Sequence, residues 1–504
     1  MITKSETMRD SLRVSELITA LPEEIAGEKA SRGALEELVT GIETRQVPVG
    51  SLSRMWILGS MQAKIAMGYL AYAVRSGFVN DSVKQKMLNE ANLAAALKLF
   101  GTMGYLRGAV MKVGQLLGNL PQVLPREFSE VLGSLQFEAP PMHYAMIREV
   151  FFNELGREPD ELFASFDKKA FAAASLGQVH RARLKSGEEV AVKIQYPNMM
   201  RMIISDMRNL RTLVPLIRFQ KDWAYIMDHL RDLEQMLKLE ADYEREAGFM
   251  RMAYELFKDD EQIVVPKYYE RFSSKRVLTM DYVPGKHLQD FIKENPPQEL
   301  RNHFGELISA ALIRLSYVSK IFYTDPHPGN FLIMDNGRLG FIDFGCHREL
   351  TEEQWQMTNN GEKVLLYDQD EELLKKVIAF GCLCDDVSEL EPDRFELARK
   401  CVEWHAEPAQ KDEVFDFGDD DWYQRGVEVN VSMVRRRHTR YGPVYNWTNR
   451  AILGHRTLMY RLKSKFNFRR VYMANNPNVD MPSGAMRHVP GREKTEKPVC
   501  KSHT

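Results

Sequence analysis

The sequence predicts an α+β fold in which a β-rich region precedes a long helical one. Three observations indicate this order. Between residues 171 and 194, a strand, a loop, a strand, a turn and a strand carrying a lysine follow one another. Between residues 323 and 345, a short hairpin leads to a carboxylate, and the pattern beyond Gly345 is mainly helical. A run of strands followed by a run of helices is typical of the α+β class.

Composition limits the functional classes. The 504 residues, 44% of them hydrophobic, are enough for two or three domains with their own cores. A formal net charge of -2 argues against a general nucleic-acid binder, so we expect no nucleic-acid partner. Five scattered cysteines suit a reducing compartment. The first residues lack an apolar secretory core, so we expect no signal or transit peptide and a cytoplasmic protein.

The region 1–95 is expected to be helical. Residues 56–74 are apolar enough to raise the question of a membrane span, but Lys64 lies near their middle. A charge at the centre of a bilayer is costly, which favours a buried or interfacial helix. Membrane association, through peripheral contact, is therefore a hypothesis. Residues 473–504 are polar and rich in Pro, Lys and Arg, as in a disordered tail.

A polar pair marks the following region, 96–150. Lys112 and Gln115 are three residues apart within an otherwise apolar run, so on a helix they share one face. The pair predicts a partner or a ligand. On this segment alone, an amphipathic helix with an exposed lysine is the favoured interpretation.

The third of the first three strands carries Lys193, which follows Val-Ala-Val after a Lys-Ser-Gly turn. This order resembles the phosphate loop of kinases and the lysine that binds the phosphates. Of the three glycine positions in that loop, two are alanine here, and an alanine methyl group restricts backbone approach. We therefore expect the loop to hold phosphates differently from a protein kinase. Its candidate nucleotide-binding residues are Ala172, Ala173, Ala174, Ser175, Gly177 and Val179.

A second set of residues has the spacing of a catalytic loop. Asp325 and Asn330 form Asp-x-x-x-x-Asn, and the hairpin with its Asn-Gly turn then leads to Asp343 in Asp-Phe-Gly. Phosphoryl transfer needs a carboxylate to orient the attacking oxygen and oxygen ligands for magnesium. We assign the first role to Asp325, and the metal to Asn330 and Asp343. The alternative is a hairpin flanked by turn-forming Asp residues. Asp416-Phe417-Gly418 repeats the tripeptide without the loop, and we interpret it as a solvated acidic turn.

Together with Leu-Glu-Ala-Asp-Tyr-Glu-Arg-Glu-Ala at residues 239–247 and Lys-x-Gly-Gln at 112–115, these motifs resemble the UbiB, or aarF-domain-containing, family of atypical kinases. The resemblance covers roughly residues 100 to 350. It implies a protein-kinase-like bilobal fold with a helical extension that covers the active site and blocks peptide substrates. It also implies binding of ATP or ADP with Mg²⁺, and ATPase activity or phosphoryl transfer that supports ubiquinone or other lipid metabolism.

The resemblance also implies residue roles. Lys193 becomes the phosphate-binding lysine and Glu246 its ion-pair partner on a helix. Glu240 and Asp242 become the pair that faces the Lys112 helix across the nucleotide pocket. Asp242 and Glu246 are four apart and are expected on one helical face, although a solvated acidic face is the alternative.

Residues 278–285 fit the strand and hinge that would touch the adenine, which makes Met280 and Tyr282 candidates. A core strand running into a turn would show the same pattern. The chain also departs from the family: Tyr323 stands where histidine is frequent, and Phe249 replaces a common asparagine. Because the metal ligands are intact, we expect these departures to affect the reaction rate and the choice of substrate more than the binding of a nucleotide.

Two features of the helical region allow a second interpretation. Cys382, Cys384, Cys401 and His405 could be mistaken for a zinc site, but their spacing and the usual burial of free cysteine favour core packing. Basic residues at 435–438 and at 461–470 form two clusters. The second, set among Leu462, Phe466 and Phe468, resembles an interfacial helix for anionic lipid, although a solvated face is the commoner case.

The expected domains are a helical region at 1–95, the extension at 96–150, a kinase-like N-lobe at 151–285, a helical C-lobe at 286–472 and a tail at 473–504. The predicted function is Mg-nucleotide binding with ATP hydrolysis or phosphoryl transfer to a small or lipidic acceptor, isoprenoid or phenolic, with lipid-biosynthetic enzymes as expected partners. A catalytically silent nucleotide-binding scaffold for such enzymes is the alternative. A phosphotransferase acting on a soluble alcohol is a third, disfavoured by the extension.

Overall fold

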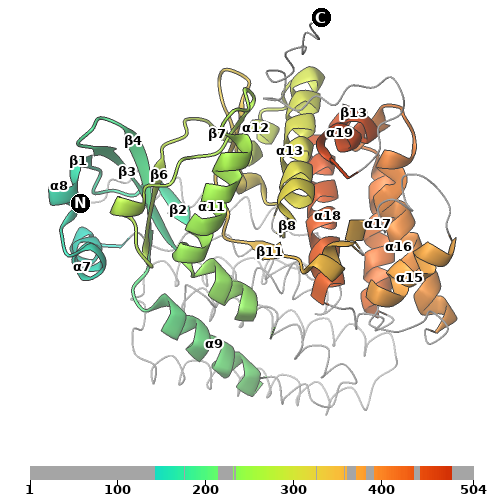
Figure 1. Cartoon of the computed structure of the whole chain (residues 1–504), viewed down its shortest axis with the longest axis horizontal. Coiled ribbons are helices and arrows are strands. Elements are labelled where there is room, and N and C mark those ends of the chain that lie inside the picture. The colour runs from blue at the N-terminus through green and yellow to red at the C-terminus, as the bar shows by residue number, and fades with distance from the viewer. Residues whose placement is uncertain are drawn as a thin grey trace, which may run out of the picture. The chain divides into compact units, whose positions relative to one another are not determined.

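A computed structural model describes residues 142–174, 176–213, 231, 234–324, 326–356, 358–359, 371–381, 391–435 and 443–478 (Figure 1). The chain forms two compact units. One takes Met1–His143, Ala172–Gln178 and Gln195–Ala241, and the other takes Tyr144–Phe171, Val179–Ile194 and Asp242–Thr504. The predictions for residues 56–74, Lys112 and Gln115 lie outside the described residues, and the expected domain boundaries stay a prediction.

The first unit contains β2 (Ala172–Ala174), α9 (Met199–Leu213) and the helical residues 234–240. Two buried glutamines join its segments. The side chain of Gln195 donates to the carbonyl of Ala241 at 2.8 Å, and Gln178 accepts from the backbone N–H of Met142 at 2.7 Å. Each bond therefore ties together segments that are 36 or more residues apart in sequence.

The second unit begins with α7 (Tyr144–Leu155), α8 (Pro159–Leu162) and an antiparallel sheet in the order β1-β3-β4-β6. Its strands are β1 (Phe163–Phe166), β3 (Gly177–Leu184), β4 (Glu189–Gln195) and β6 (Val277–Asp281). Gly187, with φ of +109°, allows the tight turn between β3 and β4. Strand β4 is buried from Val190 to Gln195, as its apolar run predicts, and it lies between β3 and β6 in the sheet.

Helix α13 (Gln298–Ser319) organises the helical part of this unit. It packs against α11 (Tyr243–Phe257), α18 (Pro443–Leu462) and α19 (Phe468–Asn475) (Figure 1). The other helices are α12 (Leu288–Lys293), α15 (Glu371–Gly381), α16 (Pro392–Gln410) and α17 (Asp420–Arg435), with 3₁₀ turns η2 (Glu270–Phe272) and η3 (Pro328–Asn330). One continuous apolar cluster runs from β6 through α13 to α19.

Short strands hold the loops between these helices. A four-stranded sheet has the order β5-β10-β9-β7, from β5 (Ile263–Val264), β7 (Lys286–His287), β9 (Phe331–Ile333) and β10 (Leu339–Phe341). Strand β8 (Ile321–Tyr323) pairs with β11 (His347–Glu349), and β12 (Phe415–Asp416) pairs with β13 (Lys465–Phe466). The region after Gly345 is thus mainly helical, as predicted, and β11, β12 and β13 are short exceptions.

Candidate active site

Lys193 lies in β4 opposite Leu278 of β6, and its side chain reaches α11. Its Nζ donates to both carboxylate oxygens of Glu246, at 2.8 and 2.9 Å. It also lies 3.4 Å from Oδ2 of Asp343. The expected ion pair between Lys193 and Glu246 is therefore present, and Asp343 shares the same ammonium group.

The charges of this group are largely removed from water. The side chains of Lys193 and Glu246 are 9% and 1% exposed, whereas that of Asp343 is 36% exposed. Burial by itself would lower the pKa of Lys193, but the carboxylates of Asp343 and Glu246 raise it well above its ordinary value. Lys193 is consequently a cation held between two anions, one sealed in the core and one facing solvent.

Helix α11 begins later than the sequence suggested. Asp242 is its N-cap, with φ of -101° and ψ of 89°, and its side chain accepts from the backbone N–H of Arg245 at 3.0 Å. Asp242 thus caps the helix instead of lying within it, and its carbonyl accepts the first bond of α11, from the N–H of Glu246 at 3.0 Å; that the two side chains share one face stays a prediction. The physical reason is that an aspartate can satisfy an unpaired N–H of the first turn, which favours a helix start at this point.

The predicted hairpin is confirmed. Strand β9 pairs antiparallel with β10, and the turn has the Arg338 N–H donating to Oδ1 of Asn336 at 3.2 Å and Gly337 at φ of +79°. The carboxylate follows β10 directly: Oδ1 of Asp343 accepts from the N–H of Gly345 at 3.0 Å. Phe344 is buried between these groups, with its ring 4.6 Å from that of Phe341. This anchored ring holds the Asp343 carboxylate at the end of the hairpin.

Asn330 ends η3, beside the hairpin, and its carbonyl oxygen accepts from the N–H of Ile342 at 3.1 Å. Its side-chain Nδ2 donates to the hydroxyl of Tyr323, which sits in β8. Sequence reasoning treated Tyr323 only as a departure from the family, yet this residue orients the Asn330 amide. Asp325 lies outside the described residues.

The hinge region packs directly on the hairpin. Met280 is buried in β6 opposite Ala191, and Val283 contacts the hairpin so closely that a Cβ on Gly340 would lie 2.9 Å from its Cγ1. The Arg181 guanidinium lies over the ring of Tyr282, with its Cζ 4.3 Å from the ring centroid. The adenine roles of Met280 and Tyr282 stay a prediction.

The remaining site predictions fall on the first unit or outside the described residues. Ala172, Ala173 and Ala174 form β2, and with Gly177 and the buried Glu240 they belong to the first unit. Val179 is in the second unit, and its carbonyl accepts from the N–H of Phe171 at 3.0 Å. Ser175, Lys112 and Gln115 are not among the described residues, so the roles of all these residues stay predictions.

The ABC1 atypical kinase-like domain family matches residues 134–377. The chain is 31% identical over 349 residues to the mitochondrial atypical kinase COQ8 of Saccharomyces cerevisiae, and the match covers 68% of each chain. The chain belongs to this ABC1, or UbiB, family of atypical kinases. It is also 28% identical over 469 residues to the mitochondrial atypical kinase COQ8B of Danio rerio, which covers 89% of this chain and 72% of that one.

A solved structure extends the likeness to the fold. Rv3197 from Mycobacterium tuberculosis, determined in complex with erythromycin, superposes with a TM-score of 0.55 at 25% identity, covering 79% of this chain and 100% of the other. The predicted α+β, kinase-like fold is therefore confirmed. Membership of the UbiB family supports a kinase-like activity that uses a nucleotide.

A departure from the UbiB pattern has a structural role that the sequence did not reveal. Phe249 of α11 is buried against the ring of His347, in the strand that follows Asp-Phe-Gly. Arg245 also lies over the Phe249 ring, with its Cζ 5.0 Å from the ring centroid, and it donates to the carbonyl of His347 at 2.9 Å. Burial, with the nearby Arg245, lowers the pKa of His347 to about 2. Phe249 thus joins α11 to the segment after Asp343 through apolar contact.

The second Asp-Phe-Gly is a folded turn rather than a fully solvated one. Asp416 accepts from the N–H of Gly418 at 2.9 Å and pairs with Lys465 at 2.7 Å, and its acidic neighbours are exposed as expected. Phe417, however, is completely buried. A large aromatic ring gains much free energy from burial, and this explains why the turn is anchored in the core.

The basic cluster at 461–470 is not an interfacial helix, and that alternative was wrong. Helix α18 ends at Leu462, β13 follows, and α19 begins at Phe468. The interspersed apolar side chains Leu462, Phe466 and Phe468 are buried in the core, and Arg470 pairs with Asp412 at 2.7 Å. Across the described ranges, the structure contains no helix long and apolar enough to cross a membrane.

Cys401 and His405 pack in the helical core. Cys401 is completely buried in a small apolar cluster with Leu374, Ile378 and Met433. His405 Nε2 bonds to Oδ1 of Asn449 at 2.7 Å. Cys382, Cys384 and residues 436–438 lie outside the described residues.

Proposed function

We propose that this UbiB-family protein binds ATP or ADP with Mg²⁺ and hydrolyses ATP or transfers its terminal phosphoryl group to a small or lipidic acceptor. The observation that carries the proposal is the ammonium group of Lys193, which lies between Glu246 at 2.8 Å and Asp343 at 3.4 Å. A strand lysine paired with a helix glutamate, next to the Asp-Phe-Gly carboxylate, is the arrangement with which protein kinases hold phosphates and metal.

The donor set suits magnesium. In the described part of the chain, no group of three His, Cys, Asp or Glu side chains could hold a metal. Magnesium usually takes only one or two carboxylates and completes its shell with water and substrate phosphates. Asp343 supplies a carboxylate at a partly exposed position, and the side-chain amide of Asn330, whose Nδ2 donates to the Tyr323 hydroxyl, would supply an oxygen as the second kind of ligand. When bound, magnesium would neutralise charge on the phosphates.

The residues of the chain have distinct roles in this proposal. Lys193, kept protonated by its two carboxylates, donates to a phosphate oxygen. Glu246 positions Lys193, and Asp343 and Asn330 hold the metal. The hinge around Met280 and Tyr282 receives the adenine.

Asp325 is the proposed catalytic carboxylate. The described neighbours on both sides of it are fixed: the N–H of Thr324 donates to the carbonyl of Cys346 at 3.0 Å, and Pro326 packs against Gly454 of α18. A carboxylate between two fixed neighbours suits the role of orienting an attacking oxygen, because positioning supplies much of the rate in phosphoryl transfer.

The test compares Asp343→Asn with Asp335→Asn, which changes an exposed acid in the turn of the same hairpin. ADP at a hundred times its dissociation constant should stabilise the wild type by about 2.7 kcal/mol, only with magnesium. Thermal unfolding should show this as a shift of several degrees. We expect Asp335→Asn to keep the shift and the ATPase rate and Asp343→Asn to lose both.

Two outcomes would contradict the proposal. Wild-type ATPase activity in Asp343→Asn would remove this residue from the metal site. Nucleotide binding without any turnover in the wild type would support the silent scaffold instead.

The acceptor is the finer part of the proposal. We infer a lipidic acceptor of the isoprenoid-quinone type from the UbiB resemblance, with peripheral membrane contact. The matched COQ8 relatives are named as mitochondrial, so an organelle is the alternative to the cytoplasm. Flotation with anionic liposomes, and ATPase assays with and without them, test the contact. Complete absence of the protein from the lipid fraction would argue against it.

A further inference from the structure

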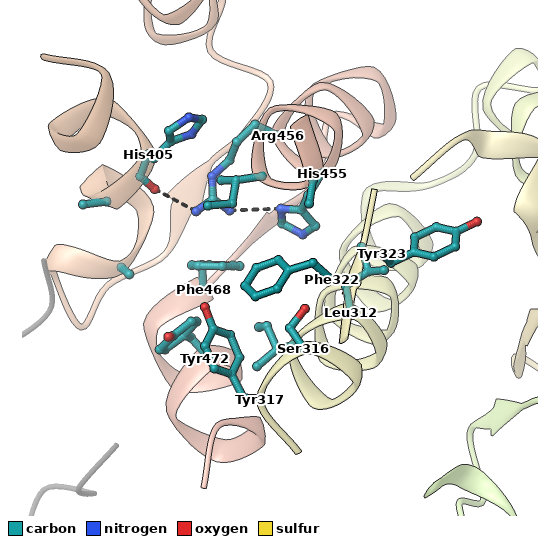
Figure 2. Close-up of a pocket in the computed structure, with 15 residues that line it drawn as sticks. Leu312, Ser316, Tyr317, Phe322, Tyr323, His405, His455, Arg456, Phe468 and Tyr472 are labelled. Carbon is teal, nitrogen blue, oxygen red and sulfur yellow. Dashed lines mark hydrogen bonds between the residues drawn. The ribbon is translucent and has the colours of Figure 1, made fainter. Parts of the chain in front are cut away.

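The helical part of the second unit contains a cavity of about 110 Å³ (Figure 2). It lies among α13, α16, α18, α19 and β8, and its walls are mainly rings and aliphatic groups. Phe322 comes from β8, and Phe468 and Tyr472 come from α19. Tyr323 belongs to the lining, but Figure 2 shows its ring directed away from the cavity. The space is thus separate from the proposed nucleotide site, with β8 as the shared wall.

Two hydroxyl groups face this apolar space. Ser316 and Tyr317 of α13 are 8% and 7% exposed, and Figure 2 shows their hydroxyls directed toward the rings of Phe322 and Phe468. Within the residues that the structure describes, neither hydroxyl has a hydrogen-bond partner. Buried hydroxyls are normally paired, because desolvation without a new bond is unfavourable. The two groups therefore indicate a hydrogen-bonding molecule in the cavity.

A positive charge also borders this space, on the other side of the Phe468 ring from the Tyr317 hydroxyl (Figure 2). Arg456 of α18 is 4% exposed, and its guanidinium stands 4.4 Å above the Phe468 ring. It donates to the carbonyl of His405 at 2.8 Å and to Nδ1 of His455 at 3.0 Å (Figure 2). Burial raises the pKa of Tyr317, and the charge of Arg456 acts in the opposite direction.

The histidines beside Arg456 add no charge. Burial lowers the pKa of His405 to about 4 and that of His455 well below its ordinary value. Since Arg456 can only donate, Nδ1 of His455 accepts, and its Nε2 donates to Ser309, 2.8 Å away. Ser309 in turn donates to the carbonyl of Gly305 at 2.7 Å. Among the cavity-lining residues, Arg456 is consequently the charged group.

We propose that this cavity is a binding site for a monocyclic aromatic carboxylate. Its ring lies among Phe322, Phe468 and Tyr472, and its carboxylate accepts from Ser316 and Tyr317 near Arg456. The volume admits a single ring at most, because it is smaller than the cavity of about 150 Å³ that is known to hold benzene. Aromatic walls favour a flat ring through offset and edge-to-face contacts. Two buried hydroxyl donors and a cation favour an anionic acceptor over a neutral one.

The experiment titrates the full chain with benzoate, toluene and benzylamine by calorimetry and saturation-transfer NMR. A ligand of this size should reach a dissociation constant of about 0.1 to 1 mM. We expect toluene to bind about tenfold more weakly than benzoate, since it lacks the charge-assisted bonds. Benzylamine should not bind, because its cation would face Arg456.

Variants locate the site. Tyr317→Phe keeps the ring and should weaken benzoate about tenfold while leaving toluene unchanged. Ala451→Met should fill the cavity and abolish the binding of both benzoate and toluene. The control Tyr423→Phe removes a hydroxyl that bonds to Thr457 at 3.2 Å, away from the cavity, and should change neither. Ser316→Ala repeats the Tyr317 test if that variant folds poorly by circular dichroism.

Three results would overturn the proposal. Benzoate binding that survives both Tyr317→Phe and Ala451→Met would place benzoate elsewhere. Equal affinity for toluene and benzoate would exclude recognition of a carboxylate. No binding of benzoate up to about 10 mM would leave water as the partner of the two hydroxyls.

Discussion

Lys193 makes unequal contacts with the carboxylates of Glu246 and Asp343, and the difference indicates that the two have different roles. Glu246 is nearer and sealed from water, whereas Asp343 is farther away and half-exposed. Removing one partner of a buried pair leaves an uncompensated charge, which is costly. Glu246 should therefore contribute more to stability, and Asp343 more to binding of a cation.

Glu246→Gln should lower the free energy of unfolding by about 3 kcal/mol, because the buried ammonium of Lys193 then loses its nearer negative charge and keeps only the more distant carboxylate of Asp343. Urea titration measures this change as a lower transition midpoint. The matched control is Glu244→Gln, which changes an exposed acid in the first turn of the same helix. A loss no larger than that of the control, within about 0.5 kcal/mol, would show that the buried pair does not stabilise the fold.

Among single residues, motif order predicted Lys193, and the resemblance to the UbiB family predicted its partner Glu246, because kinase chemistry fixes both the residue types and their order. It did not predict that Asp242 caps α11 or that Tyr323 orients Asn330. The first depends on where a helix starts, which is a competition between local hydrogen bonds. The second joins residues whose distance in space depends on the pairing of β8 with β11.

Helix α18 touches the proposed catalytic loop through a position that tolerates no side chain. A Cβ at Gly454 would lie 2.4 Å from Cγ of Pro326. Gly248 of α11 is the opposite case, since a Cβ there would meet no atom within 4 Å among the described residues, apart from its own helix. The sequence contained no signal for this contact, because the pattern of α18 does not show which loop it meets.

Two glycine substitutions distinguish the effect of helix propensity from the effect of the close contact between α18 and Pro326. Gly248→Ala should stabilise the protein by about 0.5 to 1 kcal/mol, the usual gain within a helix. Gly454→Ala should instead destabilise it by about 1 to 3 kcal/mol, because overpacking displaces α18 or the loop. ATP turnover by Gly454→Ala should fall about tenfold or more, since loop geometry controls rate. Equal gains in stability for both variants, measured by urea unfolding, would contradict the contact.

The elements themselves were largely predictable. The β9–β10 hairpin follows from its Asn-Gly turn, and β4 from a short apolar run, both local signals. The basic cluster at 461–470 was not predictable, because charge and apolar spacing do not reveal a break such as that at Leu462. There, Lys463 adopts a φ of 51°, and the chain turns into β13.

For the whole molecule, buried neutral histidines set a limit on acid stability. The pKa of His347 is lowered to about 2, that of His405 to about 4, and that of His455 well below its ordinary value. Each stays neutral in the folded protein but takes up a proton when the chain unfolds below about pH 6.5. The unfolded state then binds more protons, so stability is complete above that pH and is lost as the pH falls.

His405→Gln removes one of these groups and keeps a donor for Asn449. Between pH 7 and pH 5, a histidine with a folded pKa near 4 costs about 2 kcal/mol of stability. The variant should therefore lose about 2 kcal/mol less than the wild type over this range. Urea titrations at the two pH values measure the difference. An identical loss in both proteins would mean that His405 is already charged in the folded state.

A chain of hydrogen bonds runs from Arg456 through His455 and Ser309 to the carbonyl of Gly305. Proton exchange within it can be used to measure how often this part of the core opens. Each link donates in one direction, so the proton on Nε2 of His455 has no path to water along the chain. Its exchange with solvent requires the hydrogen bond between His455 of α18 and Ser309 of α13 to open. The lifetime of that single proton in deuterated water would therefore report how often the helical core opens.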